Sequence, residues 1–300
     1  MHTLTLMAVH AHPDDECSSG GTLARYAAEG CNTVLVTCTK GEEGEIVDPD
    51  MDTDEVKPRL GDVRVGELNA AAGILGVGHL ELLGYRDSGM AGTASNEDPR
   101  SFNKADPDEV TGRLVALIRK HRPHVLFTYA EDGGYGHPDH IMAHRITVAA
   151  FDAAGEPERY PEAGAPWTPQ KLYFCTWMMR ARFQALWRAL KERGLPIPYG
   201  DADATEPPER GVPDELITTR VDVRPFIQSK LDSYRAHRSQ IRPDRGVLQF
   251  ANDLNLAQEF IGIEGFIRAR TRVAAPDQED DLFAGLRNEP AAVSRRLSAR

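Results

Sequence analysis

Residues 3–39 read TLTLMAVHAHPDDECSSGGTLARYAAEGCNTVLVTCT, and they indicate the fold class. The apolar run 3–9 is rich in strand formers and stops at the polar cluster 10–16, so we expect a buried strand followed by a functional loop. The pattern TLARYAAE predicts a helix that ends at Gly30, a residue type common just after helices. NTVLVTCT (32–39) predicts a second buried strand. Residues 3–39 are therefore predicted to form a β-α-β unit.

The same alternation continues along the chain. Helical spacing covers 62–75, 108–121 and 138–153, and apolar strands are predicted at 79–84, 124–130 and 171–177. Strands that are apolar throughout and alternate with helices are typical of a parallel sheet covered on both faces. We therefore predict an α/β fold, a Rossmann-like three-layer sandwich with a mostly parallel sheet and a smaller C-terminal extension. No GxGxxG motif follows the first strand, so a dinucleotide site has no support.

Length and local composition suggest one compact unit with three parts. Residues 1–180 are predicted to form the Rossmann-like catalytic core, and residues 181–275 to complete the same domain and its pocket. Residues 276–300 are polar and are predicted to form a flexible tail.

Composition narrows the class of partner and the compartment. A formal net charge of −11 argues against a nucleic-acid partner, because affinity for phosphates comes mainly from clustered Lys and Arg. The four cysteines form no CxxC pair and the N-terminus lacks a signal-peptide pattern, so we expect a cytoplasmic protein. No apolar window approaches the ~20 residues that span a bilayer, so no membrane role is predicted. The composition leaves open whether the chain forms a homo-oligomer.

Two polar clusters, HAHPDDE (10–16) and GGYGHPDH (133–140), follow predicted strands and each contain His-Pro-Asp. A proline after the histidine suits the first turn of a helix, and residues three apart then share a face. His12 with Asp15, and His137 with His140, can therefore converge. Two imidazoles and one carboxylate with an open fourth position are what a catalytic zinc requires. The alternative for either cluster alone is a capped helix start with solvated carboxylates.

The remaining acidic residues of these clusters have assignable chemistry. Asp14 neighbours Asp15 but points elsewhere on a helical turn, so it can act as a general base on a zinc-activated water. A protonated His137, oriented by Asp139, can stabilise the oxyanion and protonate the leaving amine. We predict one Zn²⁺ per chain, with other divalent metals possible.

At these motifs the chain resembles the LmbE/PIG-L family of zinc deacetylases, in particular its mycothiol-type members. The resemblance rests on five stretches: AHPDDE (11–16), TKGEEGEI (39–46), RVGEL (64–68), YRDSGMAG (85–92) and GGYGHPDH (133–140). It implies a Rossmann-like fold, hydrolysis of an amide, and a small-molecule amino-sugar substrate.

The resemblance also implies a role for individual residues. His12, Asp15 and His140 would be the metal ligands, Asp14 the general base and His137 the electrostatic stabiliser or acid. Further from the metal, Tyr135 would contact the substrate carbonyl, whereas Arg64 and Asp87 would grip the sugar.

The predicted reaction is removal of the acetyl group from an N-acetylglucosaminyl conjugate, such as the glucosaminyl-inositol precursor of mycothiol. A mycothiol S-conjugate amidase is the nearest rival, because EAGAPWTPQKLY (162–173) resembles that branch, while YRDSGMAG resembles the deacetylase. A bacillithiol-type or antibiotic-pathway deacetylase, or a non-catalytic sugar-binding protein, are further alternatives. The lone histidines His10, His144 and His237 are predicted to be structural.

Overall fold

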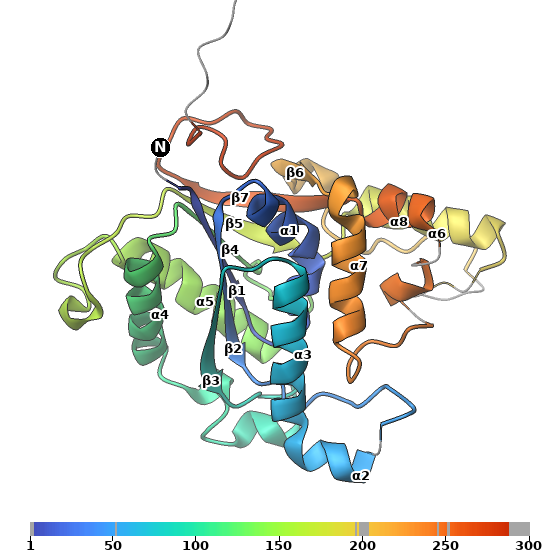
Figure 1. The fold of residues 1–300 in the computed structure, drawn as a ribbon, viewed down its shortest axis with the longest axis horizontal. Helices are drawn as coiled ribbons and strands as arrows, with labels where there is room; N and C mark the ends of the chain where they lie inside the picture. The colour runs from blue at the N-terminus through green and yellow to red at the C-terminus, as the bar shows by residue number, and fades with distance from the viewer. Residues whose placement is uncertain are drawn as a thin grey trace, which may run out of the picture.

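The computed structural model describes residues 3–51, 53–195, 197, 204–244, 246–250 and 253–287. Within these residues a seven-stranded sheet forms the centre of the molecule (Figure 1), with the strand order β3-β2-β1-β4-β5-β7-β6. The first five strands in this order are mutually parallel, and β7 is antiparallel to both of its neighbours. The strands are β1 (Thr5–His10), β2 (Asn32–Thr39), β3 (His79–Tyr85), β4 (Val125–Thr128), β5 (Lys171–Thr176), β6 (Thr219–Asp222) and β7 (Ile263–Thr271).

Helices cover both faces of this sheet. Leu6 and Ala8 of β1 pack with apolar residues of α1 and α3, whereas Met7 and Val9 point to the other face and pack with α4 and α5. Because successive side chains of a strand point to opposite faces, a fully apolar strand needs both layers. The longer helices are α1 (Gly20–Ala28), α3 (Leu60–Ile74), α4 (Pro107–His121), α5 (Pro138–Ala153), α6 (Arg180–Glu192), α7 (Ile227–Ala236) and α8 (Leu254–Ile261), with the short α2 at Thr53–Val56.

These layers confirm the predicted Rossmann-like sandwich (Figure 1). β2 and α5 occupy the residues predicted for them, 32–39 and 138–153, and the other predicted elements differ by a few residues at their ends. Among the helices of the described residues, none combines the length and the apolar character needed to cross a bilayer.

The C-terminal part contributes strands to the same sheet. β7 pairs with β5 on one side and with β6 on the other. Glu264 of β7 accepts hydrogen bonds from the backbone N–H groups of Gly21 and Thr22 at 3.0 and 2.8 Å, and it pairs with Lys230 of α7 at 2.5 Å. A carboxylate at the first turn of α1 satisfies N–H groups that have no partner within the helix. The C-terminal part is thus fastened to the start of α1.

The prediction of a flexible tail is wrong for residues 276–287. Glu279 is buried and accepts hydrogen bonds from Lys171 at 2.5 Å and from Tyr173 at 2.7 Å. Phe283 is fully buried and packs edge-on against Tyr26, with ring centroids 5.1 Å apart. Because this segment is polar overall, its sequence did not indicate that Glu279 is paired and that Phe283 is buried. Residues 288–300 of the predicted tail lie outside the described residues.

Replacing Phe283 by alanine is therefore expected to lower the free energy of unfolding by about 3–5 kcal/mol, as for other buried aromatic residues. Denaturant unfolding measures this change. Leu254→Ala serves as the control, because that side chain is 44% exposed and its loss is expected to cost about 0.5 kcal/mol or less. Equal stability of Phe283→Ala and wild type would restore the prediction of a frayed tail.

Candidate active site

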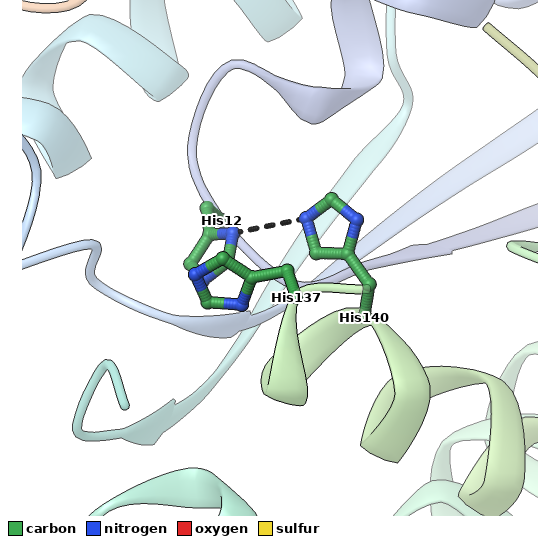
Figure 2. A group of neighbouring side chains, drawn as sticks. All are labelled: His12, His137 and His140. Carbon is green, nitrogen blue, oxygen red and sulfur yellow. Dashed lines mark hydrogen bonds between the residues drawn. The ribbon is translucent and has the colours of Figure 1, made fainter. Parts of the chain in front are cut away.

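Two loops meet at the carboxyl ends of neighbouring parallel strands. β1 is followed by residues 11–14 and the 3-10 helix η1 (Asp15–Ser19), and β4 is followed by residues 129–137 and α5. Because β1 and β4 are adjacent and parallel, both loops leave the sheet at the same edge. The first loop carries His12, the second ends at His137, and His140 lies in the first turn of α5. Figure 2 shows the three imidazole rings gathered at one point.

The two His-Pro-Asp motifs start their helices differently. Pro138 is the first residue of α5 and His137 is its N-cap, as predicted. η1, in contrast, begins only at Asp15, because Asp14 has a φ of 107° and cannot be part of a right-handed helix. Asp15 still turns back to the metal-ligand side, where its Oδ2 accepts the backbone N–H of His12 at 2.7 Å.

The ligand atoms of the three predicted ligands lie at nearly equal separations, with Asp15 using a different oxygen towards each ring. His12 Nδ1 is 3.3 Å from His140 Nε2, and Asp15 places Oδ2 3.3 Å from His12 Nδ1 and Oδ1 3.3 Å from His140 Nε2. Ligands at 2.0–2.1 Å from a tetrahedral zinc are about 3.3–3.4 Å apart. The spacing of these atoms therefore fits a tetrahedral divalent cation with three protein ligands.

Hydrogen bonds on the far side of each ligand ring fix which nitrogen carries the proton. His12 Nε2 is 3.1 Å from Asp139 Oδ2, and His140 Nδ1 is 3.0 Å from the carbonyl oxygen of Gly133. Because a carboxylate and a carbonyl only accept, these two nitrogens are the donors. The lone pairs are left on His12 Nδ1 and His140 Nε2, the two atoms that face each other across 3.3 Å. Two facing lone pairs repel each other unless a proton or a metal ion lies between them, and a metal ion bound by both rings meets this requirement.

His137 lies beside this set, and distance alone does not exclude it. Nitrogen atoms of His12, His137 and His140 are all within 4.8 Å of one another. However, Nδ1 of His137 accepts the backbone N–H of Asp139 at 3.2 Å, so its proton is on Nε2. A protonated Nε2 cannot bind a metal, but it can donate a hydrogen bond into the site.

The surroundings of His137 favour its neutral form, whereas the sequence analysis expects a protonated ring. Burial lowers the pKa of His137, and the electrostatic effect of the neighbouring His12 and His140 lowers it further, to about 4. A metal cation in the same place would act in the same direction. His137 is thus a neutral donor through Nε2–H, and an imidazolium is not needed for that role.

Charges around the ligands favour a cation. Burial lowers the pKa of His12, but its hydrogen bonds to Asp139, Asp15 and Asp87 outweigh burial and hold this pKa well above its usual 6.5. Burial raises the pKa of Asp15, but His140 and His12 outweigh it and hold this pKa well below the usual value. The side chains therefore surround the site with negative charge and stabilise a positive one.

Asp14 lies at the edge of the metal site and its carboxylate lines the neighbouring cavity. Burial raises the pKa of this carboxyl to about 6, although the nearby Arg64 guanidinium, 3.2 Å from Asp14 Oδ1, opposes the shift. A base with a pKa near the working pH is well matched to proton transfer. Its positive φ is a strained conformation that costs about 1–3 kcal/mol and needs support from its surroundings.

Arg64 and Asp87 are engaged within the chain. Arg64 is buried and donates to the carbonyl oxygens of Gly41 at 2.8 Å and Pro13 at 2.5 Å. Asp87 accepts the backbone N–H of Gly89 at 2.8 Å, and its Oδ1 is 3.5 Å from His12 Nε2. The structure thus places both beside the ligand loops, and sugar contacts for them stay a prediction.

A cavity of about 980 Å³ opens in front of the ligands. Tyr135 stands in its wall, 57% exposed, with its hydroxyl 3.5 Å from His140 Nε2. Trp177 and Leu216 line the same cavity and are also exposed, at 44% and 51%. Sites for small molecules combine such apolar walls with a few polar groups, and this cavity is of that kind.

Comparisons with known proteins agree with this geometry. Residues 7–151 match the family described as PIG-L, GlcNAc-PI de-N-acetylase. A 1D-myo-inositol 2-acetamido-2-deoxy-alpha-D-glucopyranoside deacetylase of Geodermatophilus obscurus is 44% identical over 289 residues, which covers 94% of this chain and 97% of that protein. The chain belongs to the PIG-L family. Membership confirms the resemblance found in the motifs and the prediction of an amide hydrolase of the deacetylase type.

Solved structures confirm the PIG-L fold at lower sequence identity. N,N'-diacetylchitobiose deacetylase from Pyrococcus horikoshii superposes with a TM-score of 0.58 at 19% identity, covering 88% of this chain and 83% of that one. GalB, the 4-carboxy-2-hydroxymuconate hydratase of Pseudomonas putida, gives 0.56 at 19% identity, covering 91% and 99%. Since a hydratase shares the fold, the reaction has to be argued from the site.

Tyr129 is a further residue of this PIG-L site that the sequence analysis missed. Its hydroxyl donates to Asp15 Oδ2 at 2.7 Å and accepts the backbone N–H of Ala11 at 2.7 Å. Its ring stacks on His140, with centroids 4.1 Å apart and an angle of 15° between the planes. Tyr129 thus holds two predicted ligands at once. The only signal in the sequence is its place near the end of the strand predicted at 124–130.

Tyr129→Phe keeps the stacked ring but removes the hydrogen bond to Asp15. Metal affinity is expected to fall about 10- to 100-fold, the usual effect of losing a partner of a metal ligand, while the fold is kept. Competition with a chelator of known affinity measures the change. Tyr85→Phe is a matched control, since it removes a tyrosine hydroxyl bonded to a carboxylate, Glu109, that is not among the predicted ligands. Unchanged affinity in Tyr129→Phe would show that Asp15 needs no such support.

Proposed function

We propose that this chain is a zinc-dependent deacetylase that hydrolyses the N-acetyl amide of an N-acetylglucosaminyl-inositol. One Zn²⁺ per chain would be held by His12, Asp15 and His140. The observation that carries the proposal is the set of ligand atoms 3.3 Å apart, whose lone pairs face one another. The names of relatives that match 94% of the chain at 44% identity support the choice of substrate.

A divalent cation held at this site supplies a Lewis acid, which makes a water more acidic and polarises the amide carbonyl. Asp14 takes the proton of the attacking water, for which its pKa of about 6 is suited. His137 donates its Nε2–H to the oxygen that becomes negative. Asp14 then returns the proton to the leaving amine, so that His137 does not have to be charged.

Other residues would orient this machinery. Asp139 is fully buried and accepts hydrogen bonds from His12 Nε2 and from the backbone N–H of Ser88, at 3.1 and 2.9 Å. It would thereby fix the ring of His12 rather than act on substrate. Tyr135, in the cavity wall, would contact the substrate carbonyl. Arg64 and Asp87, which lie beside the ligand loops, would position the sugar.

The test is release of primary amine from a panel of amides, together with metal analysis. The N-acetylglucosaminyl-inositol should be hydrolysed with a higher kcat/KM than N-acetylglucosamine alone, and the active protein should contain about one zinc per chain. Preference for an S-conjugate of mycothiol would indicate the amidase instead. Absence of turnover on every amide, with metal bound, would leave a sugar-binding protein.

A further inference from the structure

Glu16 and His237 form a buried pair directly behind the proposed base. Glu16 Oε1 is 2.6 Å from His237 Nε2, and both side chains are fully buried. The second oxygen of Glu16, Oε2, accepts the backbone N–H of Asp14 at 3.0 Å. The pair therefore connects α7, which ends just before His237, to the residue that carries the proposed base.

The backbone at Asp14 requires such a partner. It is one of three non-glycine residues with positive φ among the described residues, and its φ of 107° lies where side chains are unfavourable. Glu16 accepts a hydrogen bond from the N–H group of this residue, and Arg64 donates to the carbonyl oxygen of Pro13, in the same peptide group, at 2.5 Å. The peptide group that precedes Asp14 is thus fixed at both its N–H and its carbonyl oxygen.

His237 is itself firmly placed. Ser239, two residues later, donates through its backbone N–H and its hydroxyl to Glu67 of α3, at 2.7 and 2.6 Å. Its carbonyl oxygen accepts the backbone N–H of Val47 at 2.9 Å. Because the segment after α7 is tied to two other parts of the chain, His237 can hold the carboxylate of Glu16 in one orientation.

We propose that Glu16 and His237 are positioning residues, which hold the Asp14 backbone in its left-handed conformation and so aim its carboxylate at the reacting water. The inference rests on the proposed function, in which Asp14 is the base. Neither residue lines the cavity or belongs to the proposed ligand set. Glu16 and His237 should therefore affect kcat only through Asp14. A residue that merely stabilises the core would not show this dependence on Asp14.

The experiment compares Glu16→Gln, His237→Ala and His237→Gln in the full-length metal-loaded enzyme. Glu16→Gln and His237→Ala should lower kcat about 10- to 100-fold, because small misplacements of a catalytic group have effects of this size. KM and the zinc content should stay at the wild-type values. His237→Gln, which can still donate to Glu16, should recover most of the lost kcat. If one variant fails to fold, the other two variants still test the positioning role.

The decisive measurement repeats Glu16→Gln in the Asp14→Asn background. There the residual activity should be nearly unchanged by Glu16→Gln, since the base that Glu16 positions is already gone. An equal loss in both backgrounds, loss of zinc, or wild-type kcat in the Glu16→Gln single variant would overturn the proposal. Asp14→Asn alone tests the base separately, so failure of the proposed function is recognisable on its own.

Glu81→Gln provides a matched control, because it changes the other close Glu–His pair among the described residues in the same way. Glu81 Oε1 is 2.7 Å from His121 Nε2, at the opposite end of the parallel strands from the metal site. This variant should leave kcat, KM and zinc content as in wild type. A loss of kcat in Glu81→Gln as large as in Glu16→Gln would mean that such changes act through the fold, and would contradict the positioning role.

Discussion

His140→Ala is expected to lose its metal and its activity together. The imidazole contributes one of three ligand atoms, and removal of mere hydrogen-bond partners of ligands already costs about 10- to 100-fold in affinity, so a ligand should cost more. Zinc content after dialysis and the rate of amine release measure the two losses. Both should fall to the level of the chelated wild-type protein.

His137→Ala is the control for that variant, three residues away on the same turn. It should keep its zinc, because its Nε2 carries a proton and its Nδ1 accepts the N–H of Asp139. Its kcat should fall by about 10² to 10³, the usual loss on removing one oxyanion donor. Zinc loss in His137→Ala, combined with zinc retention in His140→Ala, would mean that ligand and donor are assigned the wrong way round.

Asp14→Asn is expected to keep its fold and its zinc but to lose about 10² to 10⁴ in kcat, the contribution of a general base. Asparagine tolerates a positive φ, so the turn at residue 14 survives the change. Steady-state kinetics and metal analysis test this result. A kcat near the wild-type value would remove Asp14 from the mechanism.

The pH dependence of kcat/KM gives a second check on Asp14. A base acts only when it is deprotonated, so the wild-type value should be level at high pH and fall tenfold per pH unit on the acid side. The midpoint should lie at or below the pKa of about 6, because a bound cation favours the carboxylate. Asp14→Asn should lack this acid limb. Persistence of the same limb in the variant would assign it to another group.

Much of the fold could be predicted because its strands are buried on both faces. β2, NTVLVTCT, is apolar almost throughout and stands between a glycine-terminated helix and a polar loop, so its residues were predicted as observed. β7, IEGFIRART, mixes charged and apolar residues and pairs with β5 from far along the chain. No local pattern indicates such a partner, which is why the antiparallel end of the sheet was not predicted.

The candidate site, like the fold, could be predicted only where its residues are close together in the sequence. His12, Asp15, His137 and His140 could be predicted to converge because the spacing within each motif is local and both motifs follow parallel strands. Glu16 and His237 are 221 residues apart and form one buried pair. In the sequence, Glu16 is simply the last acidic residue of a polar cluster, and His237 is an isolated histidine. Only the packing of α7 against α1 and α3 brings them together.

The place of β7 in the sheet also sets the order in which a nascent chain completes its fold. Strands β1 to β5 leave the ribosome first, but the outer edge of β5 pairs with residues that follow it by roughly 90 positions, a wait on the order of 5–20 s at ordinary rates of synthesis. An unpaired edge is a template for pairing with other chains. The edge of β5 is therefore open to such pairing until β7, the last strand of the described residues to be synthesised, closes it.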